Sequence, residues 1–419
     1  MAVSVKNKES SDLGITQFNP LSPEVRSDPY PYYTWLRRYD PVHWGASGDP
    51  HTAGCWYITR YDDVVAVLKD QRFGREVWRI LPPEAHPPVS ESYQAIVDMS
   101  RQWMVLRDPP AHTRLRMLVQ RVFTPRMIER LTPHMTGIVN ELLNHVQSQG
   151  RMEVIADFGL PLAVIVIAEL LGVPPEDRPL FLPWTAALAA VIEFKQTDEV
   201  QAQGNQAITE LNDYLRDIIA ERRRHPREDL ISALIRSEAE GEKISEAEFL
   251  GTCTQLLFGG NEPVAHMIGD GLLALFRHPD QLELWRANPA LTDTAIDELM
   301  RYDSSVQMTF RYALEDVTFG GKTIHQGELV AVVLGSANRD AAQFARPDQL
   351  DLTRMPNRHM SLGLGIHYCM GAALSRSEGQ VAFNILLQRF PKLRLETTPL
   401  RWNETVAVRG LQSLPVSFE

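Results

Sequence analysis

The most chemically informative segment of the chain runs from Ser361 to Gly371 and reads Ser-Leu-Gly-Leu-Gly-Ile-His-Tyr-Cys-Met-Gly. Gly363 and Gly365 precede Cys369, and a helical pattern follows the segment. Because glycine accepts positive φ angles, this spacing predicts a tight loop whose backbone can approach a flat ligand closely. N–H groups at the start of a helix stabilise a thiolate, and a thiolate held in this way is a good axial ligand for haem iron.

Taken alone, Cys369 has a simpler interpretation as an incidental buried cysteine, because free cysteine is often buried. The complete string is more specific. It resembles the haem loop of the cytochrome P450 family, Phe-Gly-x-Gly-x-His-x-Cys-x-Gly. The resemblance implies haem b (iron protoporphyrin IX) as cofactor, with Cys369 as the axial ligand of the metal and with His367 and Gly371 beside the cofactor. Leu362 stands where the family usually has Phe, which changes the packing beside the sulfur but not the ligation.

A second motif, Asp108-Pro-Pro-Ala-His112-Thr-Arg-Leu-Arg116, places a histidine and an arginine four residues apart on one helical face. Such a pair can hold a dianionic ligand, although the spacing alone equally fits a solvated basic face. In the family that the chain resembles, this His and this Arg bind the haem propionates. Arg311 and His367 match two further propionate partners of the family.

A third motif, Glu298-Leu-Met-Arg301, places two opposite charges at i and i+3 on a helix. Alone it indicates an ordinary surface pair. In the family, an arginine placed like Arg354 joins this pair in a buried network, so the resemblance implies a structural role for all three residues.

The segment Phe258-Gly-Gly-Asn-Glu-Pro-Val264 lies in a long helical pattern, and the resemblance makes it the oxygen site. Gly259 and Gly260 leave room for oxygen, and Glu262 supplies an acid. Pro263 replaces the alcohol that the family usually has here; it lacks an N–H group and is expected to kink the helix. The freed Gly259 carbonyl, with Asn261 and a water molecule, is a candidate substitute for the hydroxyl, and a kink without any role in protonation is the alternative.

By resemblance, the substrate pocket is lined by bulky and mainly apolar side chains, a composition that suits a medium-sized organic molecule. Core packing is the alternative for each aromatic residue among them. The candidate pocket residues are Trp78, Trp103, Met104, Phe258, Val306, Gln307, Met308 and Leu411.

The elements that must position these groups are mainly helical. Ser245 and Glu248 form a capping box that opens a helical pattern of some thirty residues, ending near Arg277. Cys55 to Thr59 reads as a strand, and four prolines make Pro82 to Pro88 irregular. We expect a mainly α protein with a smaller β region.

The resemblance implies a single cytochrome P450 domain over residues 1–419. Its α-rich body is expected over roughly 105–310. Its β-rich parts are expected over roughly 40–60, 310–335 and 392–418.

Composition restricts the class of protein and the compartment in which it is expected. The 419 residues carry a formal net charge of −11, which argues against nucleic-acid binding through a general basic surface. Three cysteines cannot form a disulfide framework in a chain of this length. Met1 to Ser11 is too polar for a signal peptide, and the apolar run Leu160 to Val173 is too short to span a bilayer. A soluble cytoplasmic protein is expected, with no membrane partner, and a monomer is usual in the family.

The resemblance therefore implies a bacterial, soluble, ferredoxin-dependent haem-thiolate monooxygenase that hydroxylates or epoxidises an organic substrate with O2, in secondary metabolism. No Gly-x-Gly-x-x-Gly dinucleotide loop is present, so electrons are expected from a ferredoxin and a ferredoxin reductase. Arg107, Arg114, Arg121 and Arg126 are candidate docking residues or an ordinary solvated face. Two alternatives remain: an oxidative-coupling, cyclising or peroxide-driven enzyme on the same fold, and a non-enzymatic haem-thiolate sensor or binding protein.

Overall fold

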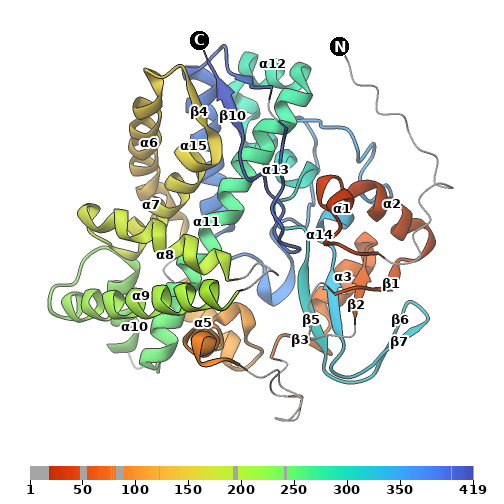
Figure 1. Cartoon of the computed structure of the whole chain (residues 1–419), viewed down its shortest axis with the longest axis horizontal. Coiled ribbons are helices and arrows are strands. Elements are labelled where there is room, and N and C mark those ends of the chain that lie inside the picture. The colour runs from red at the N-terminus through yellow and green to blue at the C-terminus, as the bar shows by residue number, and fades with distance from the viewer. Residues whose placement is uncertain are drawn as a thin grey trace.

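The computed structural model describes residues 18–47, 54–76, 78, 80–81, 89–121, 123–191, 197–239, 243–397 and 399–418. Helices form most of the described chain (Figure 1). The main sheet lies to one side of the helical body, whereas β4 (Arg151–Glu153) and β10 (Pro415–Ser417) lie among the helices near α6 and α15. The α-helices are α1 (Pro23–Ser27), α2 (Tyr30–Tyr39), α3 (Tyr61–Lys69), α4 (Gln94–Ser100), α5 (Ala111–Gln120), α6 (Pro125–Gln147), α7 (Leu160–Leu171), α8 (Arg178–Ala190), α9 (Asp198–Arg224), α10 (Leu230–Ala239), α11 (Glu246–Arg277), α12 (Pro279–Ala287), α13 (Thr292–Tyr302), α14 (Leu334–Ala337) and α15 (Ala372–Arg389).

The long helix α11 passes through the helical body and packs against α7, α9 and α15. It begins at the predicted capping box: Ser245 Oγ accepts from the Glu248 N–H at 3.2 Å, and Glu248 Oε2 accepts from the Ser245 N–H at 3.0 Å. It ends at Arg277, as the sequence predicted, and Pro263 lies inside it without ending it. Most residues of its second half are buried, because neighbouring helices cover that half on most sides.

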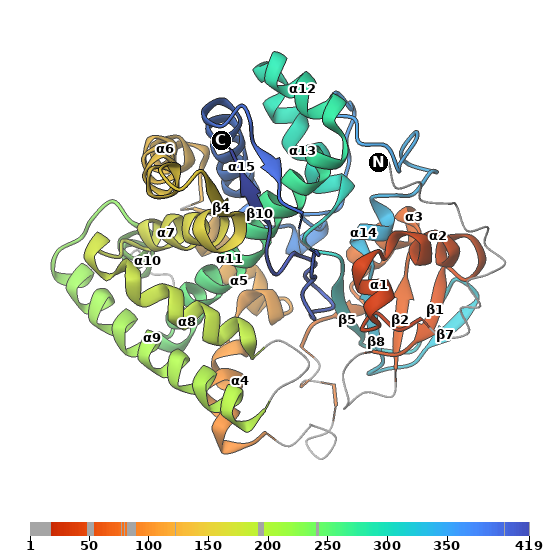
Figure 2. The same ribbon diagram turned by 45° about the horizontal axis from the view of Figure 1, so that its top comes forward.

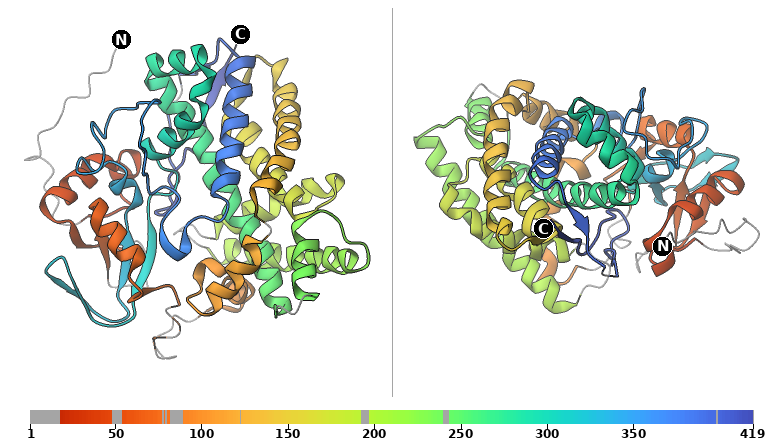
Figure 3. Two further views of the ribbon diagram at one scale, coloured as in Figure 1. Left: turned by 180° about the vertical axis from the view of Figure 1, so that it is seen from behind. Right: turned by 90° about the horizontal axis from the view of Figure 1, so that it is seen from above.

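The helices around α11 run in pairs. Figure 2 shows α8 and α9 side by side, and α4 meets α9. Seen from behind, α15 runs beside α6 (Figure 3). These pairs cover α11, so the residues that it presents to the Cys369 loop are held on a well-packed element.

The apolar segment around α7 is longer than the sequence predicted. A π-helical segment, Val154–Gly159, leads directly into α7. Val154–Leu171 is therefore long and apolar enough to cross a membrane by length and composition, but 72% of it is buried inside the fold. It packs against α11, which is the position of a core helix.

The strands come from both ends of the chain. The main sheet has the order β1-β2-β8-β5-β3, in which β2 and β8 are parallel and the other neighbours are antiparallel. All four residues of β8 are buried, as expected of a central strand covered on both faces. The strands are β1 (Val42–Gly45), β2 (Cys55–Ile58), β3 (Phe73–Gly74), β4 (Arg151–Glu153), β5 (Thr309–Ala313), β6 (Val317–Phe319), β7 (Lys322–Ile324), β8 (Leu329–Val332), β9 (Arg394–Leu395) and β10 (Pro415–Ser417).

The predicted fold class is confirmed, and strands occur in each of the three predicted β-rich parts. Two strands were not predicted: β3, and β4, which lies inside the predicted α-rich body and pairs with β10. Both are two or three residues long, too short to show a periodic pattern. The prediction for Pro82 to Pro88 lies outside the described residues.

Candidate functional site

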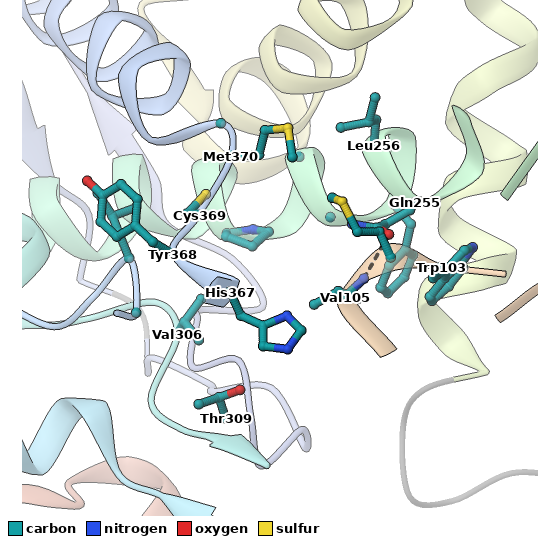
Figure 4. A pocket seen from close by; sticks show the side chains of 18 of the residues that line it. Trp103, Val105, Gln255, Leu256, Val306, Thr309, His367, Tyr368, Cys369 and Met370 are labelled. Atoms are coloured by element: carbon teal, nitrogen blue, oxygen red, sulfur yellow. Dashed lines mark hydrogen bonds between the residues drawn. The ribbon is translucent and has the colours of Figure 1, made fainter. Parts of the chain in front are cut away.

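A cavity of about 660 Å³ lies between α11 and the loop that carries Cys369. Its walls are mainly apolar, and Figure 4 shows Cys369 and His367 on the loop beside α11. The cavity brings together most of the residues singled out in the sequence. These are Trp103, Met104, His112, Arg116, Phe258, Gly259, Gly260, Pro263, Val306, Arg311, His367, Cys369 and Gly371.

The Cys369 loop has the conformation that its glycines predicted. Gly363 and Gly365 have φ angles of +70° and +74°. A Cβ on Gly365 would stand 2.7 Å from the carbonyl oxygen of Leu68, so a side chain there would clash with backbone. The Cys369 N–H donates to the Leu362 carbonyl at 2.8 Å, which closes the loop and places Cys369 at the cavity wall.

The surroundings of Cys369 act on the pKa of its thiol in opposite directions. Burial raises the pKa of its thiol, and the Gly371 N–H, Arg116 and Arg376 offset this only in part. The Gly371 N–H lowers the pKa of the thiol, in the direction that the helix start predicted, but desolvation outweighs its effect together with those of Arg116 and Arg376. A bound metal cation deprotonates a coordinating thiol outright, so this site fits a sulfur that becomes a thiolate on binding metal.

Arg75 and Arg311 form a cationic cluster at the cavity wall, and both donate to Thr309 Oγ1. Burial and the charge of Arg311 lower the pKa of Arg75 to about 9, and burial lowers the pKa of Arg311 to about 10. Asp108 opposes both shifts, and its carboxylate accepts from the backbone N–H of Arg75 and of Glu76 at 2.9 Å. Positive charge therefore exceeds negative charge in this part of the cavity.

His112 and His367 complete this cluster, with ring centroids 4.3 Å apart. Both ring nitrogens of His112 are buried without a hydrogen-bond partner among the described residues. Burial, followed by Arg116, lowers the pKa of His112 to about 4; burial, followed by Arg75, lowers the pKa of His367 strongly. The unpartnered nitrogens of His112 and the unpartnered Nε of Arg75, beside the excess of positive charge, fit a ligand with two carboxylates. Together with the Cys369 thiol they fit haem.

Arg75 and Thr309 were missed by the sequence interpretation. Arg75 follows β3 and has no helical partner at i±4 that would mark a motif. The two residues meet only because β3 pairs with β5 in the main sheet.

On α11, the structure separates the five residues expected at the oxygen site. Gly259, Gly260 and Pro263 line the cavity, and a Cβ built on Gly259 would meet no described atom within 4 Å. Asn261 and the half-buried Glu262 do not line it. Asn261 lies two residues beyond Gly259, about 200° around the helix, so its side chain cannot join the Gly259 carbonyl as expected. Neither amide atom of Asn261 has a partner among the described residues.

Four of the expected pocket residues lie outside the cavity lining. Gln307 is buried and donates to the Ser304 carbonyl at 2.7 Å, and Met308 packs with the N-terminal helices in the core. Leu411 is fully buried in the main core, where it forms an isolated bridge with Trp402. Trp78 is half-buried. Alternation along an extended segment accounts for Gln307 alone, because it faces away from its neighbour Val306. For Met308 and Leu411 the tertiary packing decides, because both are buried in hydrophobic clusters that no local pattern marks.

Two further polar residues at the cavity wall were not singled out in the sequence. Glu378, on α15, is 1% exposed; its Oε1 has no hydrogen-bond partner among the described residues, and burial raises the pKa of its carboxyl group well above the usual value. Gln255, on α11, accepts a hydrogen bond from the Val105 N–H at 3.1 Å. Glutamate and glutamine are common on helix surfaces, so neither gave a signal without the fold.

Glu298, Arg301 and Arg354 meet as the resemblance implied. Arg301 makes two bonds of 2.8 Å to the Glu298 carboxylate, both side chains are fully buried, and Arg354 Nε reaches Glu298 Oε2 at 3.0 Å. Arg301 also donates to the carbonyls of Asn338 and Pro347 at 2.8 Å. The cluster thus ties α13 to the irregular segment that leads to the Cys369 loop.

The four arginines considered for docking are in different surroundings. Arg107 donates to Gln102 at 2.7 Å and lies 3.7 Å from Glu76, and Arg114 pairs with Glu248. Arg121 and Arg126 are exposed. Arg116 on α5 donates to the Tyr368 carbonyl at 2.7 Å, so α5 lies against the Cys369 loop, and the two segments expose the apolar side chains of Met117, Ile366 and Tyr368.

A family model described as Cytochrome P450 matches residues 189–408. The biotin biosynthesis cytochrome P450 of Bacillus subtilis is 40% identical over 398 residues, covering 95% of this chain and 98% of that protein. The cytochrome P450 monooxygenase PikC of Streptomyces venezuelae is 37% identical over 410 residues, covering 96% and 94%.

Solved structures agree with these matches. The bacillaene polyketide synthase cytochrome P450 PksS of Bacillus subtilis superposes with a TM-score of 0.88 at 38% identity, covering 96% of this chain and all of that one. P450BioI, solved with a fatty-acid-ligated acyl carrier protein, superposes with a TM-score of 0.86 at 40% identity, covering 95% and 99%. The chain belongs to the cytochrome P450 family of haem-dependent monooxygenases.

Proposed function

We propose that this enzyme inserts one oxygen atom into a medium-sized, largely apolar substrate by hydroxylation or epoxidation, with Cys369 as the proximal ligand of its haem. The observation that carries the proposal is the position of Cys369 in a glycine-shaped loop, at a mainly apolar cavity that Gly259 and Gly260 also line. Relatives named for polyketide and biotin biosynthesis and a relative named as a hydroxylase/epoxidase support a biosynthetic role.

Each group of cavity residues has a distinct task. Cys369 would hold the iron through its sulfur, and Arg75, Arg116 and Arg311 would neutralise the two propionates. The neutral rings of His112 and His367 would donate hydrogen bonds to them. Bound haem supplies the activation of O2, for which the overall reaction consumes two electrons and two protons and releases water. The apolar walls exclude bulk water from the substrate, and Gly259 leaves space beside α11. A Cβ on Gly260 would instead stand 2.8 Å from the Ile167 side chain, so Gly260 allows this close packing.

Proton delivery distinguishes this chain from the usual pattern of the family. Pro263 lines the cavity where an alcohol is usual, and the adjacent Glu262 is half-buried outside the lining. We infer that Glu262 supplies protons and that a hydroxyl or amine on the substrate completes the path to oxygen. The test is the amount of oxidised product per electron consumed, compared between substrates with and without that group. Equal yields would contradict substrate-assisted protonation.

Electrons are proposed to come from an acidic ferredoxin and its reductase. The docking surface is formed by exposed Arg121 and Arg126 together with Met117, Ile366 and Tyr368, on the side of the molecule that carries the Cys369 loop. A cationic rim around apolar groups attracts an acidic partner and then excludes water from the contact.

Pro263 also favours a second candidate function, oxidative coupling or cyclisation, or peroxide-driven oxidation, on the same fold. An enzyme that takes peroxide needs no proton relay to reduced O2. Peroxide added without any reductase separates the candidates: sustained turnover favours the second, and rapid bleaching without product favours the O2-dependent monooxygenase.

The decisive experiment for the main proposal is spectroscopic. The purified holoenzyme should give a carbon-monoxide difference spectrum of the thiolate type, and substrates should shift the ferric haem from low to high spin. A spectrum of the imidazole type from folded protein would overturn the proposal. Titration against a compound library would then identify the substrate class.

A further inference from the structure

Gln255 presents an amide N–H group to the cavity, close to the place where the substrate must react. It lies on α11 four residues before Gly259, which is one helical turn or about 6 Å along the axis. Figure 4 shows its side chain beside Val105, whose backbone N–H donates to Gln255 Oε1 at 3.1 Å. This bond fixes the orientation of the amide, because only the oxygen atom of the amide can accept.

The Nε2 group of Gln255 is therefore left facing away from Val105. It makes no hydrogen bond to any described residue, and Gln255 is half-buried at the cavity wall. Two other polar groups of the wall are already engaged: Ser100 Oγ donates to the Val97 carbonyl at 2.9 Å, and Thr309 accepts from Arg75 and Arg311. Gln255 thus offers an oriented neutral donor on α11, whereas the unpartnered polar groups His112 and Glu378 belong to α5 and α15.

We propose that Gln255 Nε2 donates a hydrogen bond to an oxygen atom of the substrate, so that the enzyme selects largely apolar molecules that carry a carbonyl, hydroxyl or ether oxygen about one helical turn from the carbon that is oxidised. This inference rests on the proposed function. When an apolar substrate displaces water, the N–H group loses its partner unless the substrate supplies one, so a substrate without an acceptor binds less well.

The test compares two probes of nearly the same shape, undecan-2-one and 2-methylundec-1-ene, in which a methylene group replaces the carbonyl oxygen. Their dissociation constants for the holoenzyme are read from the spin-state change or from displacement of haem-bound imidazole. The useful quantity is the ratio of the two constants, because comparing this ratio between wild type and variant cancels the difference in hydrophobicity of the probes.

Gln255→Met keeps the length of the side chain and removes the donor. We expect it to reduce the preference for the ketone about three- to ten-fold, the effect of one neutral hydrogen bond. Gln255→Glu keeps an acceptor for the Val105 N–H, so it remains informative if the methionine variant does not fold, and it should reduce the preference as well. Ser100→Ala, at the same wall, is the matched control and should leave the ratio unchanged.

The inference is overturned if both Gln255 variants keep the wild-type ratio, or if the wild type binds neither probe. Failure of the proposed function has a different signature, since it would abolish the thiolate-type carbon-monoxide spectrum of the wild type itself. Product analysis gives a second readout. Wild-type oxidation of undecan-2-one should concentrate on a few carbons of the chain, and Gln255→Met should spread it.

Discussion

The imidazole rings of His112 and His367 lie 4.3 Å apart at an angle of 56°, one from α5 and the other from the Cys369 loop. Their low pKa values keep both rings neutral near pH 7, and burial is the main cause in both. Each neutral ring offers one N–H donor, and neither nitrogen of His112 finds a partner in the described part of the chain. The two rings bring α5 and the Cys369 loop together at a part of the cavity where buried N–H groups lack acceptors, which carboxylate oxygens of a ligand would supply.

Replacing Arg75 with leucine should weaken haem binding about 10- to 100-fold, because a charge-assisted hydrogen bond is lost from a buried site. Transfer of haem to apomyoglobin measures the loss directly. Arg75→Lys should be intermediate, since it keeps the charge without the planar fork. Arg72→Leu, which removes an exposed arginine paired with Asp70, is the control. Equal haem loss in the Arg75 and Arg72 variants would exclude Arg75 from the propionate site.

Replacing Cys369 with serine should abolish the thiolate-type carbon-monoxide spectrum. The folded protein should survive the change, because the Cys369 N–H bond to the Leu362 carbonyl uses backbone alone. Circular dichroism verifies the fold, and the ferrous carbon-monoxide spectrum reports the ligand. Cys253→Ser, at a buried cysteine on α11, is the control and should keep the spectrum. A thiolate-type spectrum that persists in the Cys369 variant would assign the ligand to another residue.

Removing the Glu298 carboxylate should destabilise the fold by about 3–5 kcal/mol, because Arg301 and Arg354 would be left without their buried anion. Urea unfolding of Glu298→Ala measures this free energy. Glu283→Ala breaks a second i, i+3 pair, with Arg286, in which the Glu283 side chain is 68% exposed. That control should cost less than about 1 kcal/mol. Similar losses of unfolding free energy in the two variants would show that the buried Glu298 cluster stabilises the fold no more than an exposed ion pair does.

His266 should make the free energy of unfolding depend on pH. Burial lowers its pKa from 6.5 to about 4, so below pH 6.5 the unfolded chain binds a proton that the fold excludes. Stability from this group is therefore lost as the pH falls from 6.5 toward 4, by about 3 kcal/mol in total.

The measurement compares the free energy of unfolding in urea at several pH values between wild type and His266→Gln. In the wild type, Asn403 Nδ2 lies 3.0 Å from His266 Nε2, and the glutamine side chain keeps an acceptor for it. Comparing the two proteins cancels the opposite contribution of Asp270, whose pKa burial raises. If the free energy of unfolding varied with pH in the same way in both proteins, His266 would have the same pKa in the folded and the unfolded chain, which would contradict the prediction.

Reversing the charge of Arg121 and Arg126 should slow electron transfer from the ferredoxin about ten-fold or more at low ionic strength, and added salt should reduce the difference. Stopped-flow reduction of the haem provides the rate. The control is the double variant Arg38→Glu/Arg394→Glu, at exposed positions on α2 and β9, because it changes net charge equally. Equal rates in the two variants would place the docking surface elsewhere.

The residues that sequence alone identified best are those whose backbone or spacing is constrained. Gly363, Gly365 and Cys369 stand in a short loop, and the capping box at Ser245 is likewise local. Arg75 could not be identified in this way, because it reaches the cavity through the pairing of β3 with β5 across much of the chain. Pairing between distant segments leaves no periodic pattern in either one.

The side of an element was harder to predict than its type. Asn261 and Gln255 both lie on α11, but the first points away from the cavity and the second lines it. Helix geometry fixes their relative orientation, yet only the packing of α7, α9 and α15 shows which face of α11 is left open. The same limit explains why Val306 lines the cavity whereas Gln307 and Met308 do not.

The parallel pairing of β2 with β8 determines when the main sheet can form during synthesis of the polypeptide. Trp56 stands opposite Val330, so the N-terminal hairpin of β1 and β2 cannot join its sheet until most of the polypeptide has left the ribosome. During translation, the β2 edge of this hairpin stays unpaired until β8 has been synthesised, while the helices between the two strands fold. Slower translation of the segment before β8 should therefore lengthen the period in which this unpaired strand edge can cause the nascent chain to aggregate.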